Sequence, residues 1–206
     1  MAEPRTPLLD DAVLRAASQV IAEHGWHDFT LERVAEAAGT SRVTLYRRGV
    51  TKDLLVDALV VGAAQAWQAA LWPALTGSGT AAQRLLSALR ACCAIVEQHL
   101  PVLAGLSTAP DPVFHLDEPH SEGSRETRNV YVAPFERLLH DGVADGSLHP
   151  AGSAEETATL LFNVLPRTYL HLRTAHGWDA PRATRTLLDL LMAGVGAPSA
   201  SHDGRN

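Results

Sequence analysis

Four basic side chains gather between residues 42 and 52, and no acidic residue interrupts them. They are Arg42, Arg47, Arg48 and Lys52. Cations at this density can neutralise the phosphates of a nucleic acid, and the planar fork of an arginine matches the O6 and N7 edge of guanine. The chemistry that this stretch offers is therefore nucleic-acid binding. A solvated, arginine-rich helix end is the alternative that the charges alone leave open.

Histidine and cysteine side chains could offer acid–base or nucleophilic catalysis. The candidates are His24, His99, His140, His171, Cys92 and Cys93. None lies in a catalytic motif such as G-x-S-x-G, a glycine-rich phosphate loop or H-E-x-x-H. His115 and His120 have two carboxylates between them, but their spacing fits no strong zinc template. We therefore expect neither an enzyme nor a metal site, and no cofactor.

Local helix signals favour nucleic-acid binding over a solvated helix end. Residues 30–55 predict a helix, a tight turn, a second short helix and the start of a long third helix. Side chains that favour helix N-caps precede all three, at Thr30, at Thr40 or Ser41, and at Thr51. Gly39 falls just past the first helix, where a left-handed backbone conformation is common. Two short helices joined in this way form a helix-turn-helix, whose second helix fits the major groove of DNA.

The second of these helices divides into an inner and an outer face. Val43 and Leu45 are expected to reach the core. The side chains left for the outer face are Arg42, Thr44, Tyr46, Arg47 and Arg48.

The segments FTLERVAEAAGTSRVTLYRR and KDLLVDAL resemble the N-terminal DNA-binding domain of the TetR family of bacterial transcriptional regulators. The resemblance covers about residues 8–60, and beyond them it is only architectural. One departure follows the Tyr-Arg pair, where Gly49 stands at a position that commonly holds an aromatic residue. This departure predicts a looser turn into the next helix.

The resemblance implies which residues contact DNA. Thr30 and Lys52 correspond to phosphate contacts, and Val43 to a core or thymine-methyl contact. The groove-facing set is Arg42, Thr44, Tyr46 and Arg48, with Arg47 on the same outer face. Arg42 is the best candidate for a bidentate contact to guanine, because its guanidinium has the matching geometry.

The resemblance also implies partners. We expect a homodimer, paired through the last two long helices, because two recognition helices about 34 Å apart read a palindromic operator in successive major grooves. A small-molecule effector would bind the larger domain, in a cavity for which ordinary filled core is the alternative. Its candidate lining residues are Trp67, Cys92, Val96, Phe135, Phe162 and Tyr169. The expected function is a transcriptional repressor released by the effector. A helical protein–protein adaptor without specific DNA binding is the alternative.

Helical periodicity without sustained strand alternation predicts an all-α fold. The expected domains are a three-helix DNA-binding domain over 1–55, a helical effector-binding and dimerisation domain over 56–196, and a disordered tail over 197–206. A long helix is expected over 51–72 and another over 124–145. The segment 107–123 is expected to be a loop.

Bulk composition sets a few further expectations. Hydrophobic residues make up 46% of the 206-residue chain, which is enough for a substantial core. The net charge of −6 does not argue against DNA binding, because phosphate neutralisation is local. We expect no signal peptide and no membrane segment. Cys92 and Cys93 are adjacent and unsuited to a structural disulfide, so a cytoplasmic location is expected.

Overall fold

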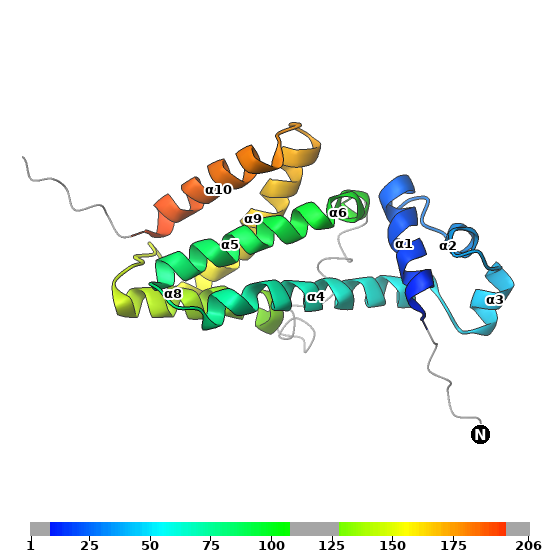
Figure 1. Cartoon of the computed structure of the whole chain (residues 1–206), viewed down its shortest axis with the longest axis horizontal. Helices are drawn as coiled ribbons and strands as arrows, with labels where there is room; N and C mark the ends of the chain where they lie inside the picture. Colours follow the sequence, from blue (N-terminus) through cyan, green and yellow to red (C-terminus); the bar gives the residue numbers. More distant parts are fainter. Residues whose placement is uncertain (1–8, 108–127, 197–206) are drawn as a thin grey trace, which may run out of the picture. The chain divides into compact units, whose positions relative to one another are not determined.

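The computed structural model describes residues 9–107 and 128–196, and within these ranges the chain forms helices and no named strand (Figure 1). The predicted all-α fold is therefore confirmed. The helices are α1 (Asp11–His24), α2 (Leu31–Ala37), α3 (Arg42–Arg47), α4 (Lys52–Thr76), α5 (Ala81–Gln98), α6 (Leu100–Leu106), α8 (Ala133–Asp145), α9 (Ala154–Thr174) and α10 (Ala180–Val195).

The described residues fall into two compact units. The first contains residues 9–65 and 99–107, and the second contains 66–98 and 128–196. The boundary between the units falls inside α4, so this one helix contributes to both cores.

The first unit is built around one buried face of α1. That face is made of Val13, Ala16, Ala17, Val20 and Ile21, as the helical spacing of apolar residues predicts. Phe29, Val34, Leu45 and Leu55 complete the same cluster, from the chain before α2 and from α2, α3 and α4. The core therefore holds the helix-turn-helix against α1.

A glycine lets α6 approach α1 closely. A Cβ atom on Gly105 would lie 2.2 Å from the carbonyl oxygen of Ile21, so a larger residue cannot occupy this position without movement of the backbone. The backbone N–H of Trp26 donates to the carbonyl of Gly105 at 3.2 Å. Leu106 adds its side chain to the cluster. The first unit thus includes a helix distant in sequence from the predicted three-helix domain.

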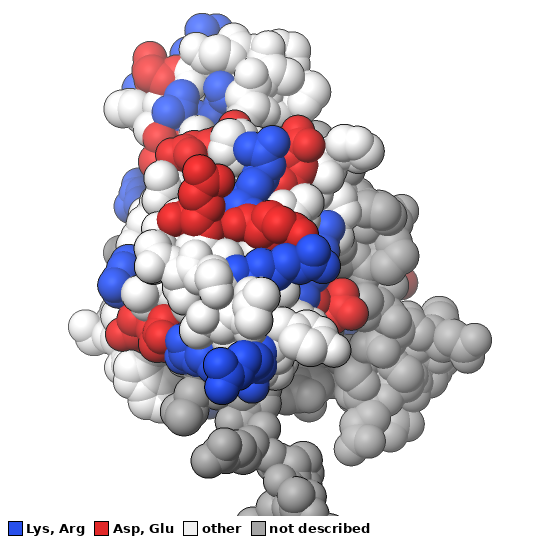
Figure 2. Space-filling view, turned by 90° about the vertical axis from the view of Figure 1, so that its right-hand side faces the viewer, with Lys and Arg blue, Asp and Glu red and all other residues white. Residues whose placement is uncertain are grey.

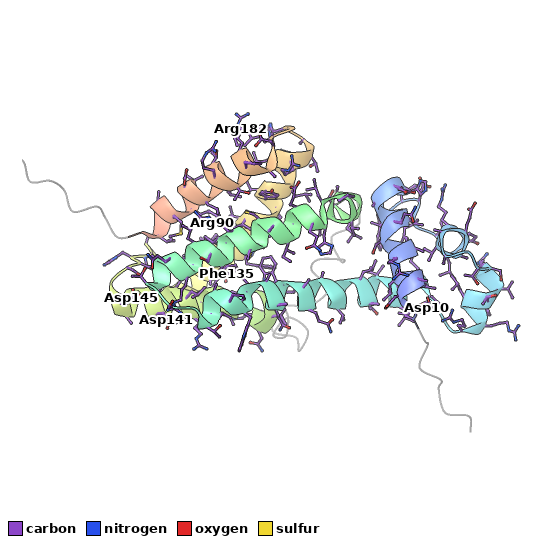
Figure 3. All side chains as sticks on the ribbon, viewed as in Figure 1. Asp10, Arg90, Phe135, Asp141, Asp145 and Arg182 are labelled. Atoms are coloured by element: carbon purple, nitrogen blue, oxygen red, sulfur yellow. The ribbon has the colours of Figure 1, made fainter. Side chains whose placement is uncertain are left out.

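The second unit packs α5, α8, α9, α10 and the end of α4 around a core of leucine and aromatic side chains. The N-terminus of α5 is capped from the turn after α8, where Asp145 accepts from the N–H of Ala81 at 2.7 Å. Ser147 accepts from the N–H of Ala82 at 3.0 Å. Asp141 adds an ion pair with Arg84 at 2.9 Å, and Figure 3 shows Asp141 and Asp145 at this end of the unit.

Two helix boundaries differ from the expectation. The long helix continues through Pro73 to Thr76, because a proline removes only one hydrogen bond and here lies near the helix end. The helix expected over 124–145 is interrupted by a turn at Val132, and α8 begins at Ala133 with a proline in its first turn. Residues 108–127, with most of the expected loop, and the tail at 197–206 lie outside the described residues.

We expect no membrane segment from the sequence, but α4 is both long and apolar. By length and composition alone, this helix could cross a membrane. A core helix of a water-soluble protein meets the same criteria. Leu55 and Leu71 of α4 are buried in the cores of the first and second units, which accounts for part of its apolar character.

Candidate nucleic-acid interface

The second helix of the motif, α3, is fixed by its start and by one buried residue. Ser41 caps the helix, because its Oγ accepts from the N–H of Thr44 at 3.1 Å. The hydroxyl of Thr44 lies 2.9 Å from the same oxygen. Leu45 is fully buried in the core of the first unit. The other α3 side chains are therefore left on the outside, at a defined rotation about the helix axis.

The turn after α3 is closed rather than loose, which corrects the expectation from Gly49. The N–H of Gly49 donates to the carbonyl of Tyr46 at 2.9 Å, and the N–H of Val50 donates to that of Leu45 at 3.0 Å. This pair of bonds is a Schellman motif, and Gly49 takes the left-handed conformation it requires, with φ 75°. Val50 is 1% exposed, so it fills core space beside Leu45.

The outer face of α3 carries an apolar and an aromatic side chain. Val43 is 66% exposed and Tyr46 is 77% exposed. The expectation that Val43 reaches the core is therefore wrong. Successive residues turn by about 100° around an α-helix, so Val43 lies roughly 200° from Leu45 and points to the opposite side. Of its two predicted roles, a base contact is the one that its exposure permits.

The arginine that begins α3 and the arginine just after its last residue have acidic partners. Arg42 Nη1 lies 2.5 Å from Glu32 Oε1, and Arg48 Nη2 lies 2.8 Å from Asp10 Oδ2. The Arg42 pair is more than half exposed on both sides, whereas the Arg48 side chain is only 33% exposed. Sequence spacing gave no signal for the pair with Asp10, because the two residues are 38 positions apart. Arg47 is exposed on the same helix.

The two predicted phosphate contacts flank this helix in the sequence. Thr30 caps α2, since its Oγ1 accepts from the N–H of Arg33 at 3.3 Å. Lys52 holds its ammonium 4.2 Å from the centre of the Trp26 ring and 5.4 Å from that of Phe29. The aromatic pair thus positions the Lys52 cation.

Charges of both signs alternate over the face drawn in Figure 2, where basic side chains are blue and acidic ones red. This face does not carry one continuous basic field. Its electrostatic attraction for phosphate is accordingly weaker than the count of arginines in residues 42–52 suggests.

The second unit brings three of the predicted ligand residues together. The ring of Trp67 lies 6.1 Å from that of Phe135 and 6.0 Å from that of Phe162, centre to centre. Figure 3 labels Phe135 within this unit. Tyr131, which was not among the predicted residues, stacks on Phe162 at 5.3 Å and lies 5.8 Å from Trp67. Its spacing of four residues from Phe135 on a helical segment was an available signal.

The other three predicted ligand residues lie in the same unit with other neighbours. Tyr169 donates its hydroxyl to Glu97 Oε2 at 3.0 Å and lines an open groove of about 580 Å³ between α5 and α10. Cys92 and Val96 are buried on α5, and burial raises the pKa of the Cys92 thiol well above its usual value. Tyr169 and the Trp67 cluster do not share that groove.

One buried polar atom of the aromatic cluster has no partner. The indole Nε1 of Trp67 makes no hydrogen bond within the part of the chain that the structure describes, although the residue is only 5% exposed. An unpaired buried N–H costs about 1–3 kcal/mol. No charged side chain is buried among the described residues.

No group of three or more histidine, cysteine or acidic side chains that could hold an ion occurs within residues 9–107 and 128–196. His115 and His120, the candidates from the sequence, lie outside the described residues.

Comparison with known proteins identifies the N-terminal region. The family model described as bacterial regulatory proteins, tetR family, matches residues 13–59. No curated protein sequence matches the chain. The match covers both helices of the helix-turn-helix, α2 and α3, together with most of α1 and the start of α4.

Several solved structures share the fold. The ketosteroid transcriptional regulator KstR2 of Mycobacterium tuberculosis has a TM-score of 0.72 at 16% identity, covering 94% of this chain and 99% of that chain. A tetR-family regulatory protein from Rhodococcus RHA1 has a TM-score of 0.71 at 19% identity, covering 93% and 100%. FadR from Bacillus subtilis, in complex with stearoyl-CoA, has a TM-score of 0.70 at 17% identity, covering 89% and 97%. At these identities the similarity shows the fold.

Proposed function

Because residues 13–59 match the model of the tetR family of bacterial regulatory proteins, we propose that the chain is a DNA-binding regulator of this family, which represses transcription and is released from its operator by a small molecule. The observation that carries this proposal is the geometry of α3. One buried leucine, Leu45, fixes the helix, and the outer face presents Val43 and Tyr46 to solvent. An α-helix held in this way can enter the major groove with its outer face toward the bases.

The base-reading set follows from this orientation. Arg42 lies in the first turn of α3, where recognition helices contact base edges, and Val43 offers methyl groups to a thymine. Thr44, Tyr46, Arg47 and Arg48 complete the groove-facing set. Thr30 and Lys52 hold the phosphates on either side and set the register of the helix.

The protein acts as a homodimer on a palindromic operator. In support, the last two long helices leave large apolar side chains uncovered in the single chain: Leu160 is 62%, Val164 38% and Leu190 70% exposed. Surface of this kind on neighbouring helices marks a protein interface. Two copies joined there present two α3 helices, and a two-fold axis between them matches two inverted half-sites.

The effector is an apolar molecule with a neutral hydrogen-bond acceptor. It binds beside Trp67, Phe135 and Phe162, with Tyr131 added by the structure, whereas the other predicted residues, Cys92, Val96 and Tyr169, have other neighbours in the same unit. The unpaired Trp67 N–H supports this class, because an acceptor such as a ketone or ester oxygen would remove the cost of its burial. The descriptions of two similar structures also support an apolar effector, since one is a ketosteroid regulator and the other is a complex with stearoyl-CoA.

The two sites communicate through α4. Residues 52–65 of this helix belong to the first unit and residues 66–76 to the second. A ligand beside Trp67 favours the state of α4 to which it binds more tightly, and it shifts the equilibrium only by that difference in affinity. A shift of α4 alters the spacing of the two recognition helices and weakens binding to the palindrome.

The proposed function is tested by selecting DNA from a random duplex pool with the purified protein. Enrichment of one inverted repeat, with binding weakened by salt, is expected. A helical adaptor without specific DNA binding would enrich no sequence, and that outcome would remove the proposal.

A further inference from the structure

Two carboxylates from different helices hold the arginines at the two ends of α3. Glu32, in the first turn of α2, reaches Arg42 at the start of α3 over 2.5 Å. Asp10, just before α1, reaches Arg48 at the end of α3 over 2.8 Å. Figure 3 labels Asp10 at this place in the first unit. The recognition helix is thus charge-compensated at both ends.

Asp10 is engaged twice, through different oxygens. Its Oδ1 accepts from the N–H of Val13 at 2.9 Å and caps α1, while its Oδ2 accepts from Arg48. The pKa of Asp10 lies below its ordinary value, chiefly because of the Val13 N–H and next because of the Arg48 hydrogen bond. The carboxylate is therefore ionised at neutral pH, and the contact with Arg48 is a full ion pair.

Among the described residues, Glu32 and Asp10 compensate two of the four cations of the 42–52 stretch. Lys52, the last cation of the 42–52 stretch, lies over the Trp26 ring. Among the described residues, Arg47 is the member of this stretch with neither a carboxylate nor a ring as partner.

We propose that Glu32 and Asp10 are specificity-determining residues that weaken binding to random DNA by occupying Arg42 and Arg48. This inference rests on the proposed function. Random duplex attracts a protein almost entirely through its phosphates. An arginine that must leave a carboxylate to reach a phosphate exchanges one anion for another and gains little.

A matched operator offers more to the same side chain. Arg42 can leave Glu32 there, because the O6 and N7 atoms of a guanine accept hydrogen bonds from two of its N–H groups. The free-energy cost of opening the Arg42–Glu32 ion pair is therefore offset at the correct base, and it is not offset at other bases. Glu32 and Asp10 thus raise the ratio of specific to random binding, and they do so at the cost of total affinity.

Two variants isolate the ion pairs from helix stability. Glu32→Gln and Asp10→Asn each remove one negative charge and preserve the shape of the side chain. Asparagine caps a helix about as well as aspartate, so Asp10→Asn keeps the start of α1. Glu36→Gln is the matched control, because Glu36 lies exposed on the same helix as Glu32 and forms no ion pair within the described residues. Melting curves of all three variants verify that each is folded.

The measurement is fluorescence anisotropy on a random-sequence duplex over roughly 50–200 mM salt. Glu32→Gln and Asp10→Asn are expected to bind about two- to fivefold more tightly than Glu36→Gln, with a salt slope steeper by up to about 1. Equal affinities and slopes in all three variants would overturn the inference while leaving the proposed function intact. A wild-type protein that binds neither random nor selected duplex would overturn both.

Discussion

Glu97 and Arg173 form a two-point ion pair, with Arg173 Nη2 2.7 Å from Glu97 Oε1 and Arg173 Nε 2.7 Å from Glu97 Oε2. The pair joins the end of α5 to the end of α9. Tyr169 donates to the same carboxylate, and Arg173 Nη1 donates to the carbonyl of Trp178 in the turn before α10. One carboxylate therefore organises the contacts of three helices in the second unit.

Replacement of Glu97 by glutamine is expected to destabilise the protein by about 1–2 kcal/mol, because charge-assisted hydrogen bonds are the stronger kind. Urea unfolding at neutral pH measures the change. Glu36→Gln, which removes an exposed carboxylate without an ion pair in the described residues, serves as control and should be near neutral.

The same pair predicts a dependence on pH. The hydrogen bond from Arg173, and after it that from Tyr169, holds the pKa of Glu97 below its ordinary value. A carboxylate whose pKa is lowered by folding stabilises the protein. This stabilisation is fully present above the pKa of the unfolded state, about 4.3, and is lost as the pH falls through the pKa of the folded state. The stability difference between wild type and Glu97→Gln should stay constant from about pH 8 to 6 and shrink below about pH 4. A difference that remains undiminished in acid would contradict this assignment.

Gly49 and Gly62 should respond to alanine in opposite directions. Gly49 has φ 75°, a region in which a Cβ atom costs about 1–2 kcal/mol, so Gly49→Ala should lower the melting temperature. Gly62 lies inside α4, where an added Cβ meets nothing within 4 Å, so Gly62→Ala should raise stability by about 0.5–1 kcal/mol. Thermal melts of the two variants side by side provide the comparison. Tolerance of Gly49→Ala would show that the turn after α3 does not need the left-handed conformation.

Aspartate at Leu160 or Leu190 should separate the proposed dimer. Both side chains are more than 60% exposed in the single chain, at 62% and 70%, and burial of a charge at an interface is unfavourable. Sedimentation velocity should show a dissociation constant raised by about tenfold or more. Val143→Asp, at a site 57% exposed on α8, should leave association unchanged. If Leu190→Asp sediments like wild type, the dimer is not formed by this face of α10.

Trp67→Phe should remove the preference of the effector site for a hydrogen-bond acceptor while keeping the aromatic packing. The probes are 2-acetylnaphthalene and 2-ethylnaphthalene, which differ by one carbonyl group. Calorimetry should give about a tenfold preference for the ketone in wild type and almost none in Trp67→Phe. The variant should unfold at the same or a higher urea concentration, since it no longer buries an unpaired N–H. Trp72→Phe, at an indole 65% exposed on the same helix, is the control. An unchanged preference in Trp67→Phe would contradict the assigned anchor.

Features that depend on local sequence were predictable. Thr30, Ser41 and Thr51 all cap helices through the bonds that their positions indicate, because a capping side chain reaches only two or three residues along the chain. The buried face of α1 was predictable for a similar reason, since its apolar residues repeat at helical spacing.

Features that depend on contacts between distant segments were not predictable. The pairing of Asp10 with Arg48 depends on the packing of α1 and α3, and the docking of α6 depends on Gly105 meeting Ile21. Val43 shows a different limit. Helical phase places Val43 opposite Leu45, but in a helix of only six residues the sequence does not show which of the two faces the core.

The central claim is that the outer face of α3 reads bases. Competition binding of wild type and Arg42→Ala against the selected operator and its single-base variants tests it most directly. Wild type should lose about 1–3 kcal/mol on substitution of one guanine, and Arg42→Ala should bind the original and substituted operators equally. An Arg42→Ala protein with the base preference and affinity of wild type would contradict the account.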